Sequence, residues 1–340
     1  MHRDASAGGL PVIPSDLAAR VRREGREGWL NELPHLIVEL AERWGLQLGT
    51  PFSRGPSVSW VAPAGLVDGI SAVLKVGMPH REASTEAAGL RFFAGQGAVQ
   101  VLRADDEVFA LVEERCDPGT DLWDLSVDEG NRVAAQLLGQ LWHPPDGAEP
   151  IERLSDLANE WKGTISRRCD SYPSGVVELG VAFAQQLATS QEELVVLHGD
   201  FHPGNVLRSQ RGWLSIDCKP LVGEPAFDLA TLLANRLGID PGRVRNSREE
   251  TGEAAWEPEN PDQWPFAPSI TARELARQID YFTDTLGLKR DRVLGWAIVR
   301  PRLELGTGND ASVRAPAVIN TVRDTEPAMW DTERASLCSG

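Results

Sequence analysis

Three oxygen-bearing side chains in the second half of the sequence have types and spacing suited to chemistry. The polar loop LHGDFHPGNVL, residues 197–207, carries Asp200 and, five positions later, Asn205. Asp217 follows at the end of an apolar run, WLSI, that predicts a buried strand. A carboxylate can orient a hydroxyl group and take its proton, and hard oxygen ligands hold Mg²⁺ against nucleotide phosphates. The set therefore fits phosphoryl transfer, with Asp200 as the base and Asn205 and Asp217 as metal ligands.

The spacing within the polar loop is that of the protein-kinase catalytic loop. In the kinase sequence H-R-D-x-x-x-x-N, the catalytic Asp precedes a metal-binding Asn by the interval that separates Asp200 from Asn205. Asp217 takes the place of the metal-binding Asp of the kinase D-F-G element. His198, at the junction of strand and loop, is expected to brace the loop through hydrogen bonds and not to carry a proton.

The sequence around the loop resembles the aminoglycoside phosphotransferase superfamily. The runs HGDFHPGN and IDCKPLVGEPAFDLA are similar to it, and GWLSIDCKPLVGEP, residues 212–225, is similar to its streptomycin 6-phosphotransferase and hydroxyurea phosphotransferase branch. Most other branches have an acidic or neutral residue at the position of Lys219. This lysine is expected either to neutralise phosphate charge or to pair with an acid. The resemblance also implies that Asp228 braces the polar loop.

The resemblance implies a nucleotide site in the first third of the chain. Lys75, inside the apolar run AVLKVG, matches the kinase strand lysine that pairs with the α- and β-phosphates. Glu86 on the following helix is its expected partner, and Glu82, one helical turn earlier, is the alternative.

The run LVEERC, residues 111–116, resembles the hinge segment whose backbone receives adenine in kinases. Glu114 and Cys116 are therefore expected to bind the nucleotide. Together with the metal ligands, these assignments imply ATP and Mg²⁺ as cofactors.

The elements that must position these residues can be predicted from apolar periodicity. A helical pattern runs from Ser15 to about Trp44, and Pro34 is expected to split it into two helices. Short extended runs follow and predict a mostly antiparallel sheet: 58–62, 72–76, 99–103 and 107–113. One helix is expected between the second and third runs, over about 81–94.

Beyond Pro118-Gly119 helical patterns dominate. The expected helices cover 133–141, 154–165, 174–189, 227–236, 271–286 and 290–305, and short strands at 194–197 and 213–216 flank the polar loop. The fold class is therefore α+β, and the resemblance makes it a two-lobed protein-kinase-like fold with an N-terminal helical extension. The expected domains are the extension (1–45), a small sheet-rich nucleotide-binding lobe (46–115) and a larger helical lobe with the acceptor site (116–340).

The overall charge limits the classes of partner. The chain has 34 Lys and Arg against 50 Asp and Glu, a formal net charge of −16. An acidic protein repels nucleic acid and attracts cations, so no nucleic-acid partner is expected and a cationic acceptor fits, although acidity serves solubility equally well. No apolar run reaches the roughly 20 residues of a membrane span, and the four cysteines lack metal-ligand spacing. A cytoplasmic protein without membrane contact is expected.

The resemblance implies an ATP-dependent O-phosphotransferase that acts on a hydroxyl of a small antibiotic and confers resistance. Streptomycin or a related aminoglycoside is the expected acceptor. One alternative is a kinase of another small acceptor, such as a nucleoside or peptide antibiotic, hydroxyurea or a metabolic alcohol. A second is a non-catalytic kinase-like binding module, against which the intact Asp200, Asn205, Asp217 and Lys75 argue.

Overall fold

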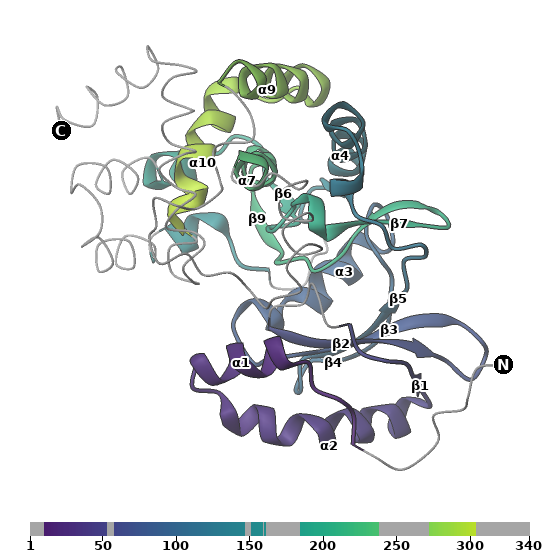
Figure 1. Ribbon diagram of the computed structural model, residues 1–340. Coiled ribbons are helices and arrows are strands. Elements are labelled where there is room, and N and C mark those ends of the chain that lie inside the picture. Colours follow the sequence, from purple (N-terminus) through teal and green to yellow (C-terminus); the bar gives the residue numbers. More distant parts are fainter. Residues whose placement is uncertain are drawn as a thin grey trace, which may run out of the picture. The chain divides into compact units, whose positions relative to one another are not determined.

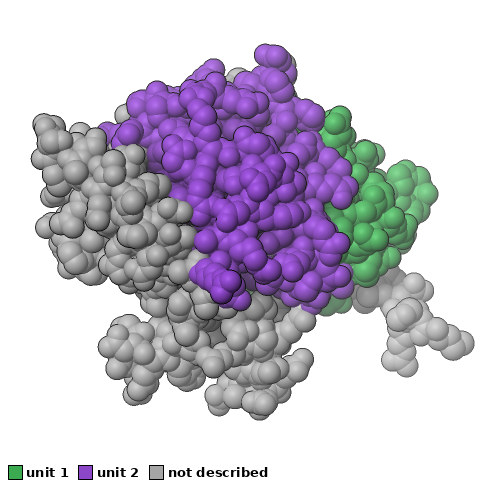
Figure 2. Space-filling model, turned by 90° about the horizontal axis from the view of Figure 1, so that it is seen from above, with its two compact units in different colours: residues 1–119, 208–214 green, residues 120–207, 215–340 purple. Residues whose placement is uncertain are grey.

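The chain divides into two compact units. The computed structural model describes residues 10–52, 58–146, 151–158, 160, 184–237 and 272–303 (Figure 1). Unit 1 comprises residues 1–119 and 208–214, and unit 2 comprises residues 120–207 and 215–340 (Figure 2). Unit 1 contains an antiparallel sheet with helices, whereas the described part of unit 2 is mainly helical. The predicted α+β class is confirmed.

Unit 1 is built on a five-stranded antiparallel sheet. In spatial order its strands are β1 (Gln47–Leu48), β2 (Ser59–Gly65), β3 (Ser71–Gly77), β5 (Ala110–Glu114) and β4 (Val101–Asp105). Strands β2 to β5 correspond to the four predicted extended runs. The two residues of β1 are too few to produce an alternating pattern in the sequence.

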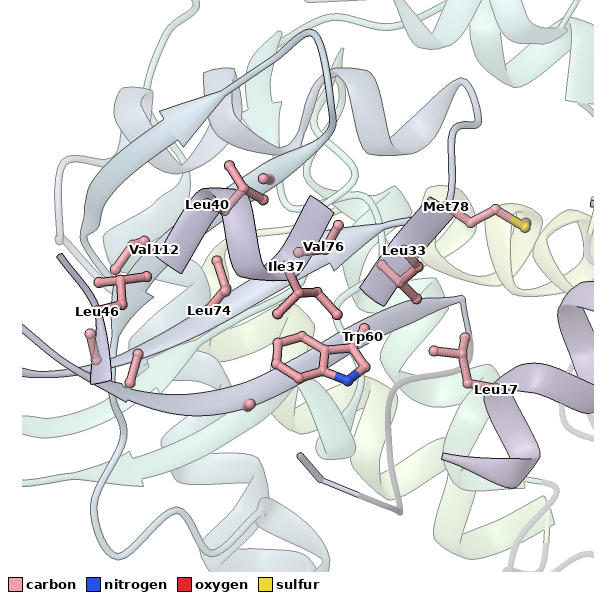
Figure 3. Packing of buried hydrophobic residues seen from close by; sticks show 14 of the residues in the cluster. Leu17, Leu33, Ile37, Leu40, Leu46, Trp60, Leu74, Val76, Met78 and Val112 are labelled. Carbon is pink, nitrogen blue, oxygen red and sulfur yellow. The ribbon is translucent and has the colours of Figure 1, made fainter. Parts of the chain in front are cut away.

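Two helices cover one face of this sheet: α1 (Ser15–Arg23) and α2 (Glu27–Trp44). Their apolar side chains point toward the strands and form one core with them (Figure 3). Fully buried members with large side chains include Val21, Leu33, Ile37, Leu40, Trp60, Leu74 and Val76. The N-terminal helices thus share a hydrophobic core with the sheet, and burial of this apolar surface is what holds α1 and α2 in place.

The prediction that Pro34 divides the N-terminal helical pattern into two helices is wrong. The break lies between α1 and α2 at Gly25, whose φ of +67° is a left-handed conformation that glycine adopts without a steric penalty. Pro34 lies inside α2, where it removes one backbone donor. Its neighbours Leu33 and Ile37 are completely buried, so the packing of α2 on the sheet outweighs the lost hydrogen bond.

Lys75 points to the other face of the sheet. Side chains alternate along a strand, so Leu74 and Val76 point into the core while Lys75 between them points the opposite way. A 3₁₀ turn, η1 (Glu82–Ser84), and helix α3 (Glu86–Phe93) follow β3, which confirms the helix predicted over 81–94.

Unit 2 contains the helices α4 (Val127–Leu141), α7 (Ala226–Leu237), α9 (Ala272–Leu286) and α10 (Arg290–Leu303), and residues 154–158 and 184–189 are also helical. Helix α10 packs on α7 and α9, and α4 contacts α9 (Figure 1). Ser126 begins α4 with a capping box, in which its hydroxyl accepts from Glu129 N and the Glu129 carboxylate accepts from Ser126 N. These helices confirm four of the six predicted, whereas most of 154–165 and 174–189 lies outside the described residues.

Two pairs of short strands frame the polar loop. Strand β6 (Val195–Leu197) pairs with β9 (Leu221–Gly223), and β7 (Val206–Ser209) pairs with β8 (Gly212–Ser215). The β6–β9 pair brings the start of the polar loop beside the segment after Asp217. Across the described ranges, no helix has the length and apolar character needed to span a bilayer.

Candidate active site

Lys75 and Glu86 form a buried ion pair in unit 1. The Lys75 ammonium on β3 donates to Oε1 of Glu86, the first residue of α3, at 2.5 Å. Their side chains are only 11 % and 8 % exposed, so each charge depends on its neighbours for the stabilisation that water would otherwise give. The partner predicted for Lys75 is therefore in contact with it, and the pair ties the strand to the helix.

The Glu114 side chain has a structural partner that the sequence did not reveal. Arg211 donates from Nε and Nη2 to the two carboxylate oxygens of Glu114, both at 2.7 Å. Arg211 also donates to the backbone oxygens of Gly95 and Ala98, at 2.7 and 2.8 Å. The expected nucleotide contact of Glu114 therefore concerns its backbone, because the carboxylate is held by the β7–β8 turn.

Cys116, the other hinge residue expected to bind the nucleotide, carries a neutral thiol. Burial raises its pKa to about 12, and the nearby Glu114 and Glu113 carboxylates act in the same direction. The thiol therefore stays protonated at neutral pH, so Cys116 offers no anionic sulfur for nucleophilic or metal chemistry. Only its backbone suits the predicted contact with adenine.

A buried carboxylate braces the start of the polar loop. Asp228, in the first turn of α7, is completely buried and accepts the backbone N–H groups of His198 and Gly199, each at 2.8 Å. The Trp142 indole N–H donates to the same carboxylate at 3.1 Å. These bonds agree with the bracing role that the resemblance implies for Asp228, and they fix the backbone immediately before Asp200.

Both ring nitrogens of His198 form hydrogen bonds with backbone groups. Its Nδ1 accepts the backbone N–H of Asp200 at 3.3 Å, so the ring proton lies on Nε2 and is donated to the backbone oxygen of Ile216 at 3.0 Å. Burial lowers the pKa of His198 to about 4, although the charges of Asp200 and Asp217 oppose this shift. The imidazole is therefore neutral at physiological pH and acts as a brace.

Asp200 is paired with Lys219. The Lys219 ammonium lies 2.9 Å from Oδ2 of Asp200, and the side chains are 35 % and 13 % exposed. The backbone of Lys219 packs directly on the loop, since its N–H donates to the His198 oxygen at 2.8 Å. Its carbonyl oxygen would lie 1.8 Å from a Cβ at Gly199, whose φ is +79°. Only glycine fits there. The contact with Asp200 agrees with the acid-pairing interpretation of Lys219.

Asn205 and Asp217 are brought to the same part of unit 2. The Asn205 amide group donates from Nδ2 to the backbone oxygen of Asp200 at 3.1 Å, and the Asn205 backbone oxygen accepts from Ile216 N at 2.9 Å. Asp217 follows at a φ of +57°, an uncommon conformation for a residue with a Cβ. Such a strained backbone is typical of functional sites, where the surrounding structure enforces it.

Asn205 and Asp217 together fit a hard cation that keeps several water ligands. Because the Asn205 NH₂ group is engaged within the loop, its amide oxygen is the atom suited to a metal, and Asp217 adds a carboxylate. Among the described residues no group of three or more His, Cys, Asp or Glu side chains could hold a metal ion. Mg²⁺ is commonly held by one or two protein oxygens together with water and substrate phosphates, so two ligands suffice.

A family match covers most of the chain. The family described as aminoglycoside/hydroxyurea antibiotic resistance kinase matches residues 43–256. Streptomycin 6-kinase from Streptomyces glaucescens is 32 % identical over 306 residues, covering 86 % of this chain and 89 % of that protein. Hydroxyurea phosphotransferase from Kitasatospora aureofaciens is 29 % identical over 305 residues, covering 86 % and 79 %.

Solved structures show the same fold. LicA in complex with AMP matches with a TM-score of 0.57 at 12 % identity, covering 86 % of this chain and 98 % of that one. A putative fructosamine-3-kinase from Thermobifida fusca matches with a TM-score of 0.54 at 19 % identity, with coverage of 86 % and 98 %. The expected kinase-like fold is thereby confirmed.

Proposed function

This chain belongs to the aminoglycoside/hydroxyurea antibiotic resistance kinase family, and we propose that it transfers the γ-phosphoryl group of ATP to a hydroxyl of streptomycin or a related aminoglycoside. The family consists of phosphotransferases that act on antibiotic hydroxyls. Two streptomycin 6-kinases, each 32 % identical to this chain, support the acceptor. The net charge of −16 agrees with a cationic acceptor.

The observation that carries the proposal is the position of Asp200 in the braced polar loop. In the transfer, the acceptor hydroxyl gives its proton to the Asp200 carboxylate while its oxygen forms a bond to the γ-phosphorus. The bond from that phosphorus to the bridging oxygen breaks, and ADP leaves with the electron pair. The backbone contacts of Asp228 and His198 keep the base in place without reorganisation.

The remaining residues are assigned to the nucleotide. Lys75, held by Glu86, would contact the α- and β-phosphates, and the backbone of Glu114 and Cys116 would receive adenine. Asn205 and Asp217 would hold Mg²⁺, which neutralises phosphate charge when bound. The support is the Lys75–Glu86 pair at 2.5 Å and the chemistry of the donor set around Asn205.

Hydroxyurea is the second candidate acceptor, since a hydroxyurea phosphotransferase is also similar over most of this chain. The polar loop acts on the reacting hydroxyl and the transferred phosphoryl group, which both acceptors have in common, and so does not separate the two acceptors. A direct assay does separate them. The purified full chain with Mg²⁺ and ATP is offered streptomycin, other aminoglycosides, hydroxyurea, a nucleoside antibiotic and a peptide antibiotic, and each product is tested by mass spectrometry for one added phosphoryl group.

Phosphorylated streptomycin is the expected product. Turnover of hydroxyurea or another class with no aminoglycoside product would refute the proposed acceptor and leave the phosphotransferase assignment intact. In the same assay, Asp200→Ala should abolish turnover while ATP binding persists. Asp106→Ala, which removes an exposed carboxylate paired with Arg91, is the matched control and should change neither.

A further inference from the structure

We propose that Lys219 is a positioning residue for phosphoryl transfer, acting through Asp200. The inference deepens the proposed function, since it takes Asp200 to be the base. Its starting point is the 2.9 Å contact between the Lys219 ammonium and Oδ2 of Asp200. An ammonium at that oxygen fixes the rotation of the carboxylate and so fixes which oxygen meets the acceptor hydroxyl.

The lysine is well anchored for this task. Its backbone N–H donates to the His198 oxygen, and its carbonyl oxygen packs against Gly199, where no side chain would fit. The α-carbons of Lys219 and Asp200 are therefore held in a fixed relation by the backbone. Only the lysine side chain has to be ordered to make the contact, which limits the entropy lost in forming the pair.

The exposure of the pair indicates a role in the reaction and a small role in folding. The Lys219 side chain is 35 % exposed, and ion pairs with that degree of exposure contribute little to stability. The Asp200 carboxylate is more deeply covered, so its orientation depends on protein groups more than on water. Placing the reacting groups correctly has a large effect on rate, because a displacement of about 1 Å can reduce it by about a hundredfold.

The lysine also keeps the two carboxylates in different roles. In the proposed roles, Asp217 and Asp200 both act next to the transferred phosphate, and either carboxylate could bind the cation. The ammonium at Oδ2 of Asp200 occupies an oxygen that a metal ion would need and repels the cation. Asp200 is thereby reserved for the acceptor, and the metal is left to Asn205 and Asp217.

The test compares Lys219→Met and Lys219→Arg with wild type. Lys219→Met should lower kcat by about 10- to 100-fold while the KM for ATP stays within about twofold, because placement of the base is lost and nucleotide binding is not. Lys219→Arg keeps a cation at the carboxylate and should recover most of the rate. Lys289→Met is the matched control, since that lysine pairs with Glu192 at 2.6 Å on an exposed surface, and its kcat should be unchanged.

A double-mutant cycle with Asp200→Asn decides whether Lys219 acts through Asp200. Once the carboxylate is gone, adding Lys219→Met should change the residual rate, measured by mass spectrometry after long incubation, by less than about twofold. An equal loss in both backgrounds, or a raised KM for ATP at unchanged kcat, would overturn the inference and make Lys219 a phosphate ligand.

The same cycle can be run on slow ATP hydrolysis, with water as the acceptor. If no antibiotic is phosphorylated, the proposed acceptor fails while the effect of Lys219 on hydrolysis is still measured. If Lys219 and Asp200 are coupled in the hydrolysis cycle, the positioning role of Lys219 is retained. If the two substitutions act independently in hydrolysis, that role is refuted.

Discussion

The two units each contain a lysine–carboxylate pair, and the pairs are built in different ways. In unit 1, Lys75 and Glu86 project from a regular strand and a regular helix and are almost completely buried. In unit 2, Lys219 and Asp200 project from irregular segments, and the lysine is about one-third exposed. The first pair is positioned by secondary structure, and the second by individual backbone contacts.

The two pairs are therefore sensitive to different substitutions. A buried pair is coupled to the fold, because removal of one partner leaves a charge without compensation. The Lys219–Asp200 pair depends instead on the close packing of the Lys219 backbone against Gly199. Substitution at the first pair should therefore alter both stability and turnover, whereas substitution at Lys219 should alter turnover alone.

The largest effect is expected at the buried pair. Lys75→Met should lower kcat/KM for ATP by about 100- to 1000-fold, since it removes the cation that we propose contacts the phosphates. It should also reduce the free energy of unfolding by about 3 kcal/mol, because Glu86 is left buried without its cation. Both are measured, by steady-state kinetics and by urea unfolding.

The double variant Lys75→Met/Glu86→Leu separates the two effects. It replaces the pair by apolar side chains and should regain stability without regaining turnover. If Lys75→Met and Lys219→Met shift the unfolding midpoint equally, the contrast between the two pairs is wrong.

The next largest effect is expected at Gly199, which packs against the backbone of Lys219. Gly199→Ala should reduce the free energy of unfolding by about 3 kcal/mol, because the new methyl group meets the Lys219 oxygen at 1.8 Å in a left-handed conformation. Gly25→Ala is the matched control: its φ is +67° but nothing lies within 4 Å, so only the backbone penalty of about 1 kcal/mol is expected. Similar losses in the two variants would show that the close approach to Lys219 is unimportant.

A smaller effect should appear in the pH dependence of stability. Burial lowers the pKa of His198 to about 4 in the folded protein, against 6.5 when unfolded, so between pH 6.5 and pH 4 mainly the unfolded chain takes up this proton. The free energy of unfolding should therefore fall by about 2 kcal/mol between pH 7.5 and pH 5 from this group, and the loss should level off below its folded pKa. Urea titrations at several pH values measure it. His198→Gln should flatten this part of the profile, and an unchanged slope would contradict the burial argument.

The smallest effect is expected at the ion pair between the Arg211 guanidinium and the Glu114 carboxylate. Arg211→Lys keeps the charge but loses the two-pronged contact and should reduce the free energy of unfolding by about 1 kcal/mol. Amide hydrogen exchange in residues 208–214 should accelerate. Arg20→Lys, at an exposed pair with Glu24, is the control and should leave exchange there unchanged. Equal exchange in the two variants would show that Arg211 does not hold the turn.

Local signals in the sequence were sufficient for much of this structure. Apolar runs located β2 to β5 and α4, α7, α9 and α10. The helical period is clearest in α4 and α9, because each of these two helices buries one face and exposes the other. The polar loop was found from the spacing of Asp200 and Asn205. Pro34 misled the prediction, since a rule about isolated helices was overruled by the buried face of α2.

Long-range contacts had no such signal. Arg211 lies 97 positions from Glu114, and nothing in the run of residues around it indicates a partner. The pairing of Lys219 with Asp200 likewise depends on how β9 lies beside β6. The strand at 194–197 was predicted, but its three-residue partner β9 was not. The sequence therefore located the helices and strands better than the long-range side-chain contacts between them.

The chain passes between the two units three times, after residues 119, 207 and 214. A single cut therefore cannot release either unit intact. A fragment ending at 119 would lack the seven-residue turn that carries Arg211, and Glu114 would lose its guanidinium partner. A split at 119/120 therefore leaves part of unit 1 on the second piece, which makes this position suited to a fragment-complementation sensor in which phosphotransferase activity returns only when the two pieces are brought together.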